Sequence, residues 1–206
     1  MRAQSVEEIR LVQKVTVALA CGALVLLAAL FWHGKNAGLL ALGAVAAAAF
    51  VAQAVLKKAG RETRVLSQIV GAIGLTCTAP GAYYVSTTHF GPTAYGLWLA
   101  NWIFAANQVC YVQTRIHGSR IQGLAKRCEH GSSLLAGQVA ALGLLLAAVH
   151  GGWLPPMSLL AFVPALARSI AWFFAKPETL AIHRLGWTEL AQALVFGVLL
   201  VVTVNF

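Results

Sequence analysis

Long apolar runs alternate with short polar segments along the whole chain, and this pattern predicts membrane-spanning helices. A helix needs about 20 apolar residues to cross roughly 30 Å of hydrocarbon. Seven runs qualify, at about 15–32, 37–56, 65–86, 93–113, 132–150, 155–174 and 187–204. They lack the period-two alternation of barrel strands. We therefore expect an all-α, polytopic transmembrane helical bundle of about seven spans, which forms a single helical membrane domain over residues 1–206.

The composition agrees with this pattern and excludes several classes of protein. Hydrophobic residues make up 59% of the chain, charged residues make up only 10%, and the mean hydropathy is +0.76. A soluble domain usually has about 25% charged residues, which surround its core. The composition therefore excludes an ordinary water-soluble globule, a nucleic-acid-binding module and a disordered chain.

The basic residues are distributed unevenly between the two sides of the predicted bundle. Of 15 Lys and Arg residues, 13 lie in the N-terminal segment or in the loops after spans two, four and six. Lys35 lies on the other side, and Arg168 lies within a span. The positive-inside rule therefore places the N-terminus in the cytoplasm and the C-terminus outside. We expect a multi-pass protein of the bacterial cytoplasmic (inner) membrane, in contact with membrane lipids and without a nucleic-acid partner.

Two ionisable residues lie inside predicted spans, where a charge is costly and is therefore a candidate for function. Arg168 lies about six residues before the cytoplasmic end of span six, and Glu189 lies at the start of span seven. They form an ion pair between the last two spans, or they line a polar cavity. The structural alternatives are an Arg168 side chain that extends to the cytoplasmic surface and a Glu189 carboxylate favoured at a helix start. Gln192 extends this polar stripe by one turn.

Span four carries a polar face. Asn101, Gln108 and Arg115 are seven residues apart and share one side of the helix. Asn107 and Tyr111 form a second pair, four residues apart. Lipid would leave the amides unpaired, so we expect this face to point into the bundle. It serves there as a hydrogen-bonding contact between helices or as the wall of a cavity.

Span three combines signals for close packing with signals for a break. Gly71 and Gly74 permit a neighbouring helix to approach closely. Pro80, followed by Gly81, lacks a backbone N–H and predicts a kink or a break in the outer half of the span.

The chain carries no recognisable metal or nucleotide motif. It contains no aspartate, no CxxC pair and no GxxxxGK[ST] loop, so we expect neither a metal site nor a cofactor. A transmembrane haem held by two histidines at matched depth is an open alternative. The two candidate sets are His117, His130 and His183 on the cytoplasmic side and His33, His89 and His150 on the other. His130, next to Glu129, is also a candidate for proton transfer or ligand contact.

The polar candidates converge on the cytoplasmic half of the predicted bundle. A cavity that opens there would be strongly positive and would suit an anionic head group, a phosphate or a diphosphate. Alternatively, the positive-inside rule by itself accounts for the basic residues on this side, without a ligand. The ligand-binding candidates are Asn101, Asn107, Gln108, Tyr111, Arg115, His130, Arg168, Glu189 and Gln192.

Five segments carry a resemblance to a known family. They read GLTCTAPGAYYV at 74–85, LWLANWIF at 97–104, YVQTRI at 111–116, AFVPALAR at 161–168 and LGWTE at 185–189. With them the chain resembles, over roughly 60–200, the YwiC-like family of bacterial integral membrane proteins. Family members usually open with a Pro-x-Glu-His-Gly-x-Trp segment and about two further spans, so this chain is expected to lack the family's N-terminal segment.

The family is similar in layout to the UbiA-type prenyltransferases, which have nine helices and a cytoplasmic mouth. Those enzymes bind prenyl diphosphate through two aspartate-rich motifs and Mg²⁺. The corresponding loops here, 1–14 and 113–131, are basic and contain no aspartate. The resemblance therefore does not support Mg²⁺-dependent prenyl transfer, and arginines would have to hold a phosphate.

Three functions follow from these features. The first is an integral membrane protein that binds an anionic lipid or isoprenoid at a cytoplasmic-facing basic cavity. If it is an enzyme, it is a prenyltransferase-like transferase without the Asp-rich Mg²⁺ motifs. The second is a non-catalytic accessory or assembly subunit of a membrane (respiratory) complex, with a membrane-protein partner. The third is a small transporter, for which Pro80-Gly81 is the broken-helix signal.

Overall fold

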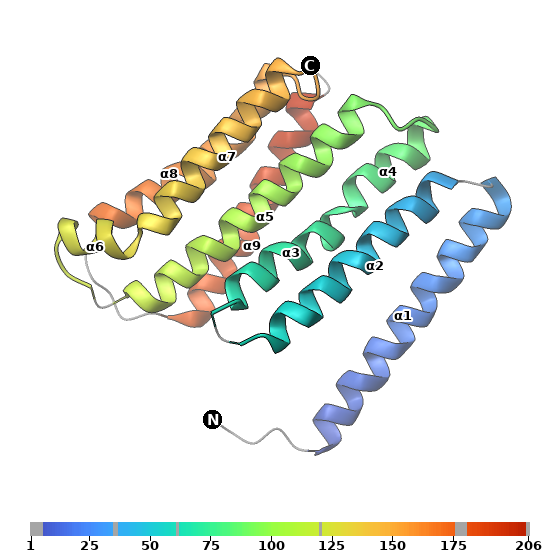
Figure 1. The fold of residues 1–206 in the computed structure, drawn as a ribbon, viewed down its shortest axis with the longest axis horizontal. Coiled ribbons are helices and arrows are strands. Elements are labelled where there is room, and N and C mark those ends of the chain that lie inside the picture. Colours follow the sequence, from blue (N-terminus) through green and yellow to red (C-terminus); the bar gives the residue numbers. More distant parts are fainter. Residues whose placement is uncertain (1–5, 35–36, 61, 120, 176–180, 205–206) are drawn as a thin grey trace. The chain divides into compact units, whose positions relative to one another are not determined.

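In the computed structural model, every regular element of the described residues is a helix (Figure 1). The described ranges are 6–34, 37–60, 62–119, 121–175 and 181–204. The elements are α1 (Val6–Gly34), α2 (Ala37–Lys58), α3 (Arg64–Thr76), α4 (Thr78–Thr87), α5 (Pro92–Gly118), α6 (Leu124–His130), α7 (Ser132–His150), the 3₁₀-helix η1 (Pro156–Phe162), α8 (Val163–Phe174) and α9 (Ile182–Val204).

Five helical segments of the described chain are long and apolar enough to cross a membrane, which confirms the all-α membrane class. They are Ala37–Lys58, Arg64–Thr87, Ser132–His150, Pro156–Phe174 and His183–Val204. The other two predicted runs, 15–32 and 93–113, lie within α1 and α5. Helix α5 has 27 residues and is long enough to cross, but its amide side chains make it less apolar than the five.

The chain divides into two compact units, residues 1–41 and residues 42–206. The first contains α1, a helix of 29 residues, and the start of α2. The second contains all the candidate site residues. The rest of the description concerns this second unit.

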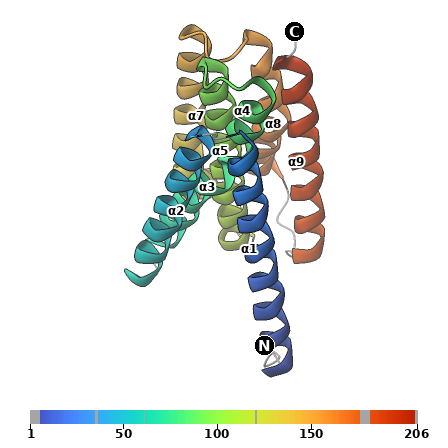
Figure 2. The ribbon, with the colours of Figure 1, turned by 90° about the vertical axis from the view of Figure 1, so that its right-hand side faces the viewer.

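Helix α5 is the central helix of the second unit. It packs against α3 and α4 and also against α7, α6 and α8. Figure 1 shows α3 and α7 on either side of it, and Figure 2 shows α5, α7 and α9 running along a common direction. Helix α9 packs against η1 and α8. A side chain on α5 can therefore meet partners from most of the other helices.

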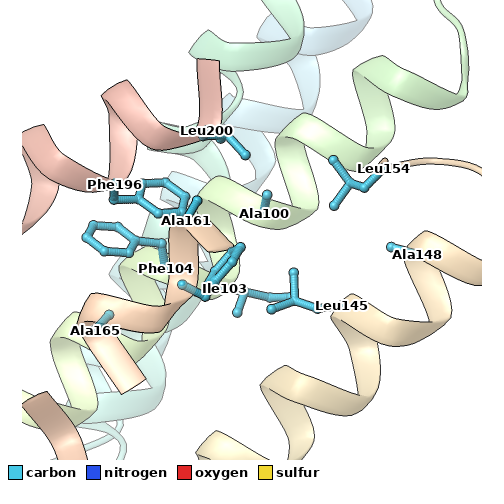
Figure 3. Close-up of a cluster of buried hydrophobic side chains, with 11 residues drawn as sticks. Ala100, Ile103, Phe104, Leu145, Ala148, Leu154, Ala161, Ala165, Phe196 and Leu200 are labelled. Carbon is cyan, nitrogen blue, oxygen red and sulfur yellow. The ribbon is translucent and has the colours of Figure 1, made fainter. Parts of the chain in front are cut away.

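The apolar core lies where α5, α7, η1, α8 and α9 meet (Figure 3). The rings of Phe104 and Phe196 stack with their centroids 4.0 Å apart, and Phe162 packs edge-on against Phe196 at 5.1 Å. Ala100 and Ala161 beside them are almost fully buried. Such small residues let helix backbones approach closely, which drives helix association in lipid. This packing fixes how α5, α8 and α9 are rotated toward one another.

The predicted break in span three is present and falls at Cys77. Helix α3 ends at Thr76 and α4 begins at Thr78. Pro80 has no N–H for the Thr76 carbonyl four residues earlier, and its ring crowds that carbonyl, so the break precedes the proline. At the break, the Cys77 N–H donates to the Gly74 carbonyl, three residues earlier, at 3.3 Å.

The glycines of span three permit close packing, as the sequence predicted. A Cβ atom at Gly71 would overlap the Gln53 side chain of α2, and one at Gly74 would lie 3.1 Å from the Ala46 carbonyl oxygen. Glycine therefore lets α2 and α3 approach at these two positions.

The Lys and Arg residues described in the second unit gather at one end of it, apart from Arg168. This basic end comprises the C-terminal ends of α2, α5 and α8, the N-terminal ends of α3, α7 and α9, and helix α6. Its basic side chains are Lys57, Lys58, Arg64, Arg115, Lys126, Arg127 and Arg184. The opposite end carries His89 and His150 but no Lys or Arg in the described residues.

Candidate functional site

A polar cluster lies between α5, α8 and α9, on the side of the core nearer the basic end. At its centre Arg168 Nη1 of α8 donates to Glu189 Oε1 of α9 at 2.5 Å. Only 14% and 18% of these two side chains are exposed. The ion pair was one of the sequence-based alternatives, and the structure forms it. The Arg168 side chain points inward and does not extend to the surface.

Two side chains of α5 hold the other parts of the Arg168 guanidinium group. Arg168 Nη2 donates to Gln108 Oε1. The guanidinium carbon lies 4.0 Å from the centroid of the Tyr111 ring, in the geometry of a cation–π interaction. Arg168 is thus held by three side chains from two helices, and none of its bonds is to the backbone.

Glu189 does not lie at a helix start. The predicted span began at residue 187, but α9 begins at Ile182, so Glu189 lies about two turns inside the helix. The helix dipole therefore does not explain this carboxylate, since the dipole acts within the first turn. The helix starts earlier than the apolar run because its first turn carries polar residues at the basic end of the bundle.

Several buried polar atoms of the cluster lack a hydrogen-bond partner among the described residues. They are Arg115 Nε, Arg168 Nε, Glu189 Oε2 and Gln192 Oε1. The Arg115 charge also acts on Glu189 and on Tyr111. Buried polar groups are normally paired, because an unpaired one costs about 1–3 kcal/mol. With two guanidinium groups and one carboxylate, the cluster is positively charged and has both donors and acceptors left to offer.

The cluster lies inside the bundle, some way from the basic end. Six residues separate Arg168 from Phe174, the last residue of α8, which is about 9 Å along a helix. Arg115 lies three residues before Gly118, the last residue of α5. A head group that enters from the basic end would therefore reach Arg115 before it reaches Arg168.

A second polar pair joins α5 to α7. Gln138 Nε2 donates to Asn107 Oδ1 at 2.5 Å, and Gln138 Oε1 is buried without a partner. An apolar cavity of about 170 Å³ lies next to this pair, lined by Asn107, Ile69 and Trp102 and by small residues of α5 and α7. Asn107 and Tyr111 share a face of α5, as predicted, but they meet different neighbours.

Two predicted candidates lie outside these contacts. Asn101 Nδ2 donates to the Leu97 carbonyl of its own helix at 2.8 Å, so it satisfies its amide locally. The His130 ring lies against Gly118 at the end of α5, where a Cβ atom would be 3.1 Å from its Cδ2. The structure therefore brings together Gln108, Tyr111, Arg115, Arg168 and Glu189, and Gln192 lies three residues after Glu189 on α9.

Gln138 and Arg127 are among the residues that make polar contacts in this unit and that sequence reasoning missed. Gln138 is the amide of α7 that faces Asn107, and its position as a single amide in an apolar run was the signal that could have found it. Arg127 was counted only as a loop charge. It lies on the short helix α6, is 4% exposed, and bonds to the carbonyls of Ile121, Trp172 and Ala175. No sequence pattern indicates this role.

No group of three or more His, Cys, Asp or Glu side chains that could hold a metal ion occurs in the described part of the chain. Of the histidines considered for haem, the His33 side chain lies outside the described residues. His117 Nδ1 lies 2.8 Å from the Gln113 carbonyl oxygen.

At the opposite end, an aromatic cavity of about 300 Å³ lies between α3, α5 and Trp153. It is lined by Ile73, Tyr95, Trp98, Leu99, Trp102 and Trp153. The indole N–H groups of Trp98 and Trp102 donate to the Ile73 and Ile69 carbonyls of α3, at 3.1 and 3.0 Å. Its walls are apolar and uncharged, in contrast to the polar cluster.

Comparisons with family models, curated proteins and solved structures found no match to this chain.

Proposed function

We propose that this is an inner-membrane protein that binds a lipid or isoprenoid with an anionic head group, at the polar cluster of Gln108, Tyr111, Arg115, Arg168, Glu189 and Gln192. The observation that carries the proposal is that two arginines, Arg115 and Arg168, each have a buried Nε atom without a partner among the described residues, while a single carboxylate pairs with Arg168. An anionic oxygen would supply the acceptors that Arg115 Nε and Arg168 Nε lack.

The position of the cluster supports a lipid as the ligand. The cluster lies within an apolar bundle, about 9 Å along α8 from the basic end, and the head group of a lipid in the cytoplasmic leaflet would enter from that end. Five helical segments of the described chain are long and apolar enough to cross a bilayer. We propose that α1 and α5 also cross, for about seven spans with the basic end in the cytoplasm. We also propose that the chain belongs to the YwiC-like family and lies in a bacterial inner membrane.

Lipid binding can be tested with charge-neutralising variants. Arg115→Gln and Arg168→Gln keep polar side chains but remove the charges, and should each weaken binding of an anionic phospholipid by about tenfold or more. Arg184→Gln is the matched control, because Arg184 is exposed at the same end. Native mass spectrometry of the purified protein with phosphatidic acid, phosphatidylglycerol or phosphatidylcholine measures the effect. Equal binding by all variants would exclude the cluster as the site.

The topology can be tested with a thiol reagent that does not cross membranes. Cys128 is exposed on α6 at the basic end. In a protein whose other three cysteines are replaced by serine, Cys128 should react only after the membrane is permeabilised. A His89→Cys variant, with Cys128 also replaced, should react in intact cells. The reverse pattern would place the basic end outside.

A further inference from the structure

The charges of the polar cluster do not balance, and the imbalance limits which head group can be bound. Arg168 is paired with the one carboxylate, Glu189, and the Arg115 guanidinium is a second positive charge that interacts with it. With Glu189 ionised the cluster carries one net positive charge, and with Glu189 protonated it carries two. The charge of the preferred ligand therefore depends on what happens to Glu189 on binding.

Arg168 already holds one anion in the described structure. Nη1 donates to Glu189, Nη2 donates to Gln108, and the Tyr111 ring covers one face. A guanidinium group has five N–H donors, and Nε has no partner among the described residues, so a phosphate could bind through Nε and an adjacent Nη while Glu189 stays. Two anions would then share one guanidinium group, where they repel. Replacing Glu189 removes that repulsion, so Glu189 is the partner that leaves.

A displaced Glu189 carboxylate would lack a counter-charge inside the bundle. Its Oε2 atom already has no hydrogen-bond partner in the described structure. An ionised carboxylate without a partner is very costly in an apolar surrounding, and such a group takes up a proton instead. The charged and titratable groups that face Glu189 are Arg168 from α8 and Arg115 and Tyr111 from α5. None of them is an acid that would supply this proton at neutral pH.

We infer that a phosphate monoester displaces Glu189 from Arg168 and is bound together with one proton, which Glu189 takes from the cytoplasmic water. The inference rests on the proposed binding of an anionic head group at the polar cluster. No covalent bond to the ligand forms or breaks, and the carboxylate becomes a carboxylic acid. The two guanidinium groups then match the two charges of a phosphate monoester, whereas a phosphodiester has a single charge and leaves one guanidinium unbalanced.

The test measures affinity against pH for the full chain in phosphatidylcholine nanodiscs. The probes are phosphatidic acid, a monoester, and phosphatidylglycerol, a diester, with identical acyl chains. Between about pH 7 and about pH 8.5 a monoester is mainly dianionic, since its second pKa is about 6. Wild-type protein should bind phosphatidic acid about tenfold more tightly than phosphatidylglycerol at the lower pH. Its affinity should fall about tenfold per pH unit, because one proton is bound with each ligand.

Two variants test whether Glu189 is the group that takes up the proton. Glu189→Gln cannot take up a proton and should bind phosphatidic acid with no dependence on pH over this range. Glu129→Gln is the matched control, since Glu129 is exposed on α6 at the basic end, and should keep the wild-type slope. If Glu189→Gln does not fold, proton uptake by the wild type in weakly buffered solution decides. About one proton per phosphatidic acid supports the inference, and none overturns it.

The outcomes separate this inference from the proposed function. Equal affinity for the two lipids without a pH slope overturns the inference and leaves anionic-lipid binding in place. No binding of either lipid above phosphatidylcholine overturns the proposed function itself. Inorganic phosphate is added as a competitor. Displacement of phosphatidic acid at equal concentration identifies a soluble phosphate as the ligand, and its failure to compete identifies the lipid. If affinity also falls with rising pH as expected, either result supports binding of a phosphate group together with one proton.

Discussion

Two buried arginines at neighbouring places in the bundle are held in different ways. Arg127 donates to three backbone carbonyls, those of Ile121, Trp172 and Ala175, and its guanidinium carbon lies 5.6 Å from the centroid of the Trp172 ring. Arg168 donates only to the side chains of Glu189 and Gln108 in the described structure. Backbone carbonyls at the end of a helix cannot turn away, whereas side chains can rotate.

The difference separates a structural arginine from an adaptable one. Arg127 donates to the Trp172 and Ala175 carbonyls at the C-terminal end of α8, of which Trp172 also accepts from the Ala175 N–H, and its charge is favoured there by the helix dipole. Arg168 leaves Nε unpaired and holds a carboxylate that can be exchanged. We therefore expect substitutions around Arg127 to affect stability alone, and substitutions around Arg168 to affect stability less and ligand binding more.

The largest expected effect is that of Arg127→Ala. It removes a buried side chain that donates to three carbonyls, those of Ile121, Trp172 and Ala175, and should lower the free energy of unfolding by about 3 kcal/mol. Denaturant unfolding in detergent, followed by tryptophan fluorescence, measures the change. Lys126→Ala, an exposed neighbour on α6, is the control and should change stability by less than about 0.5 kcal/mol. Equal effects of the two variants would remove the distinction between the arginines.

The second prediction concerns the coupling between Arg168 and Glu189. Arg168→Met leaves the carboxylate buried without its partner and should destabilise by about 2–3 kcal/mol. Adding Glu189→Gln should recover part of this loss, because the unpaired charge is removed. A double-mutant cycle on the same unfolding assay should give a coupling energy of about 1–2 kcal/mol. Additive effects would show that the ion pair makes no energetic contribution.

The third prediction concerns Gly131, which follows Arg127 by four residues. A Cβ atom at Gly131 would lie 2.7 Å from Cε1 of the buried Phe173 ring, so Gly131→Ala should destabilise by about 1–3 kcal/mol. Gly137, on α7, has open space around its Cβ position. Gly137→Ala should be neutral or stabilise by about 0.5–1 kcal/mol. Melting temperatures of the two variants should move in opposite directions, and a shared direction would contradict the packing described here.

The smallest expected effect concerns the Tyr111 ring, which lies against the Arg168 guanidinium group. Tyr111→Phe keeps an aromatic face at 4.0 Å from the guanidinium carbon, while Tyr111→Leu removes it. The leucine variant should therefore be less stable than the phenylalanine variant by about 1 kcal/mol. The comparison between the two variants cancels the loss of the hydroxyl group. Equal stabilities would mean that Gln108 and Glu189 suffice to hold the guanidinium.

Much of the helical architecture could be predicted, because apolar runs of sufficient length leave the backbone few other options in lipid. Pro80 and the glycines of span three also act locally and were interpretable. Helix α6 was missed, since its seven residues are too few to show a helical period. The start of α9 was placed too late, because the apolar run begins after the helix does.

The candidate site was predictable only as a set of residues. The sequence alone determined which spans carry polar side chains and at which end of the bundle the basic residues gather, because length and charge along one helix are local properties. Only the tertiary structure decided that Arg168 meets Glu189, Gln108 and Tyr111 while Asn107 meets Gln138. Those partners depend on how each helix is rotated about its axis. That rotation is set by the packing of small and aromatic residues contributed by several helices at once.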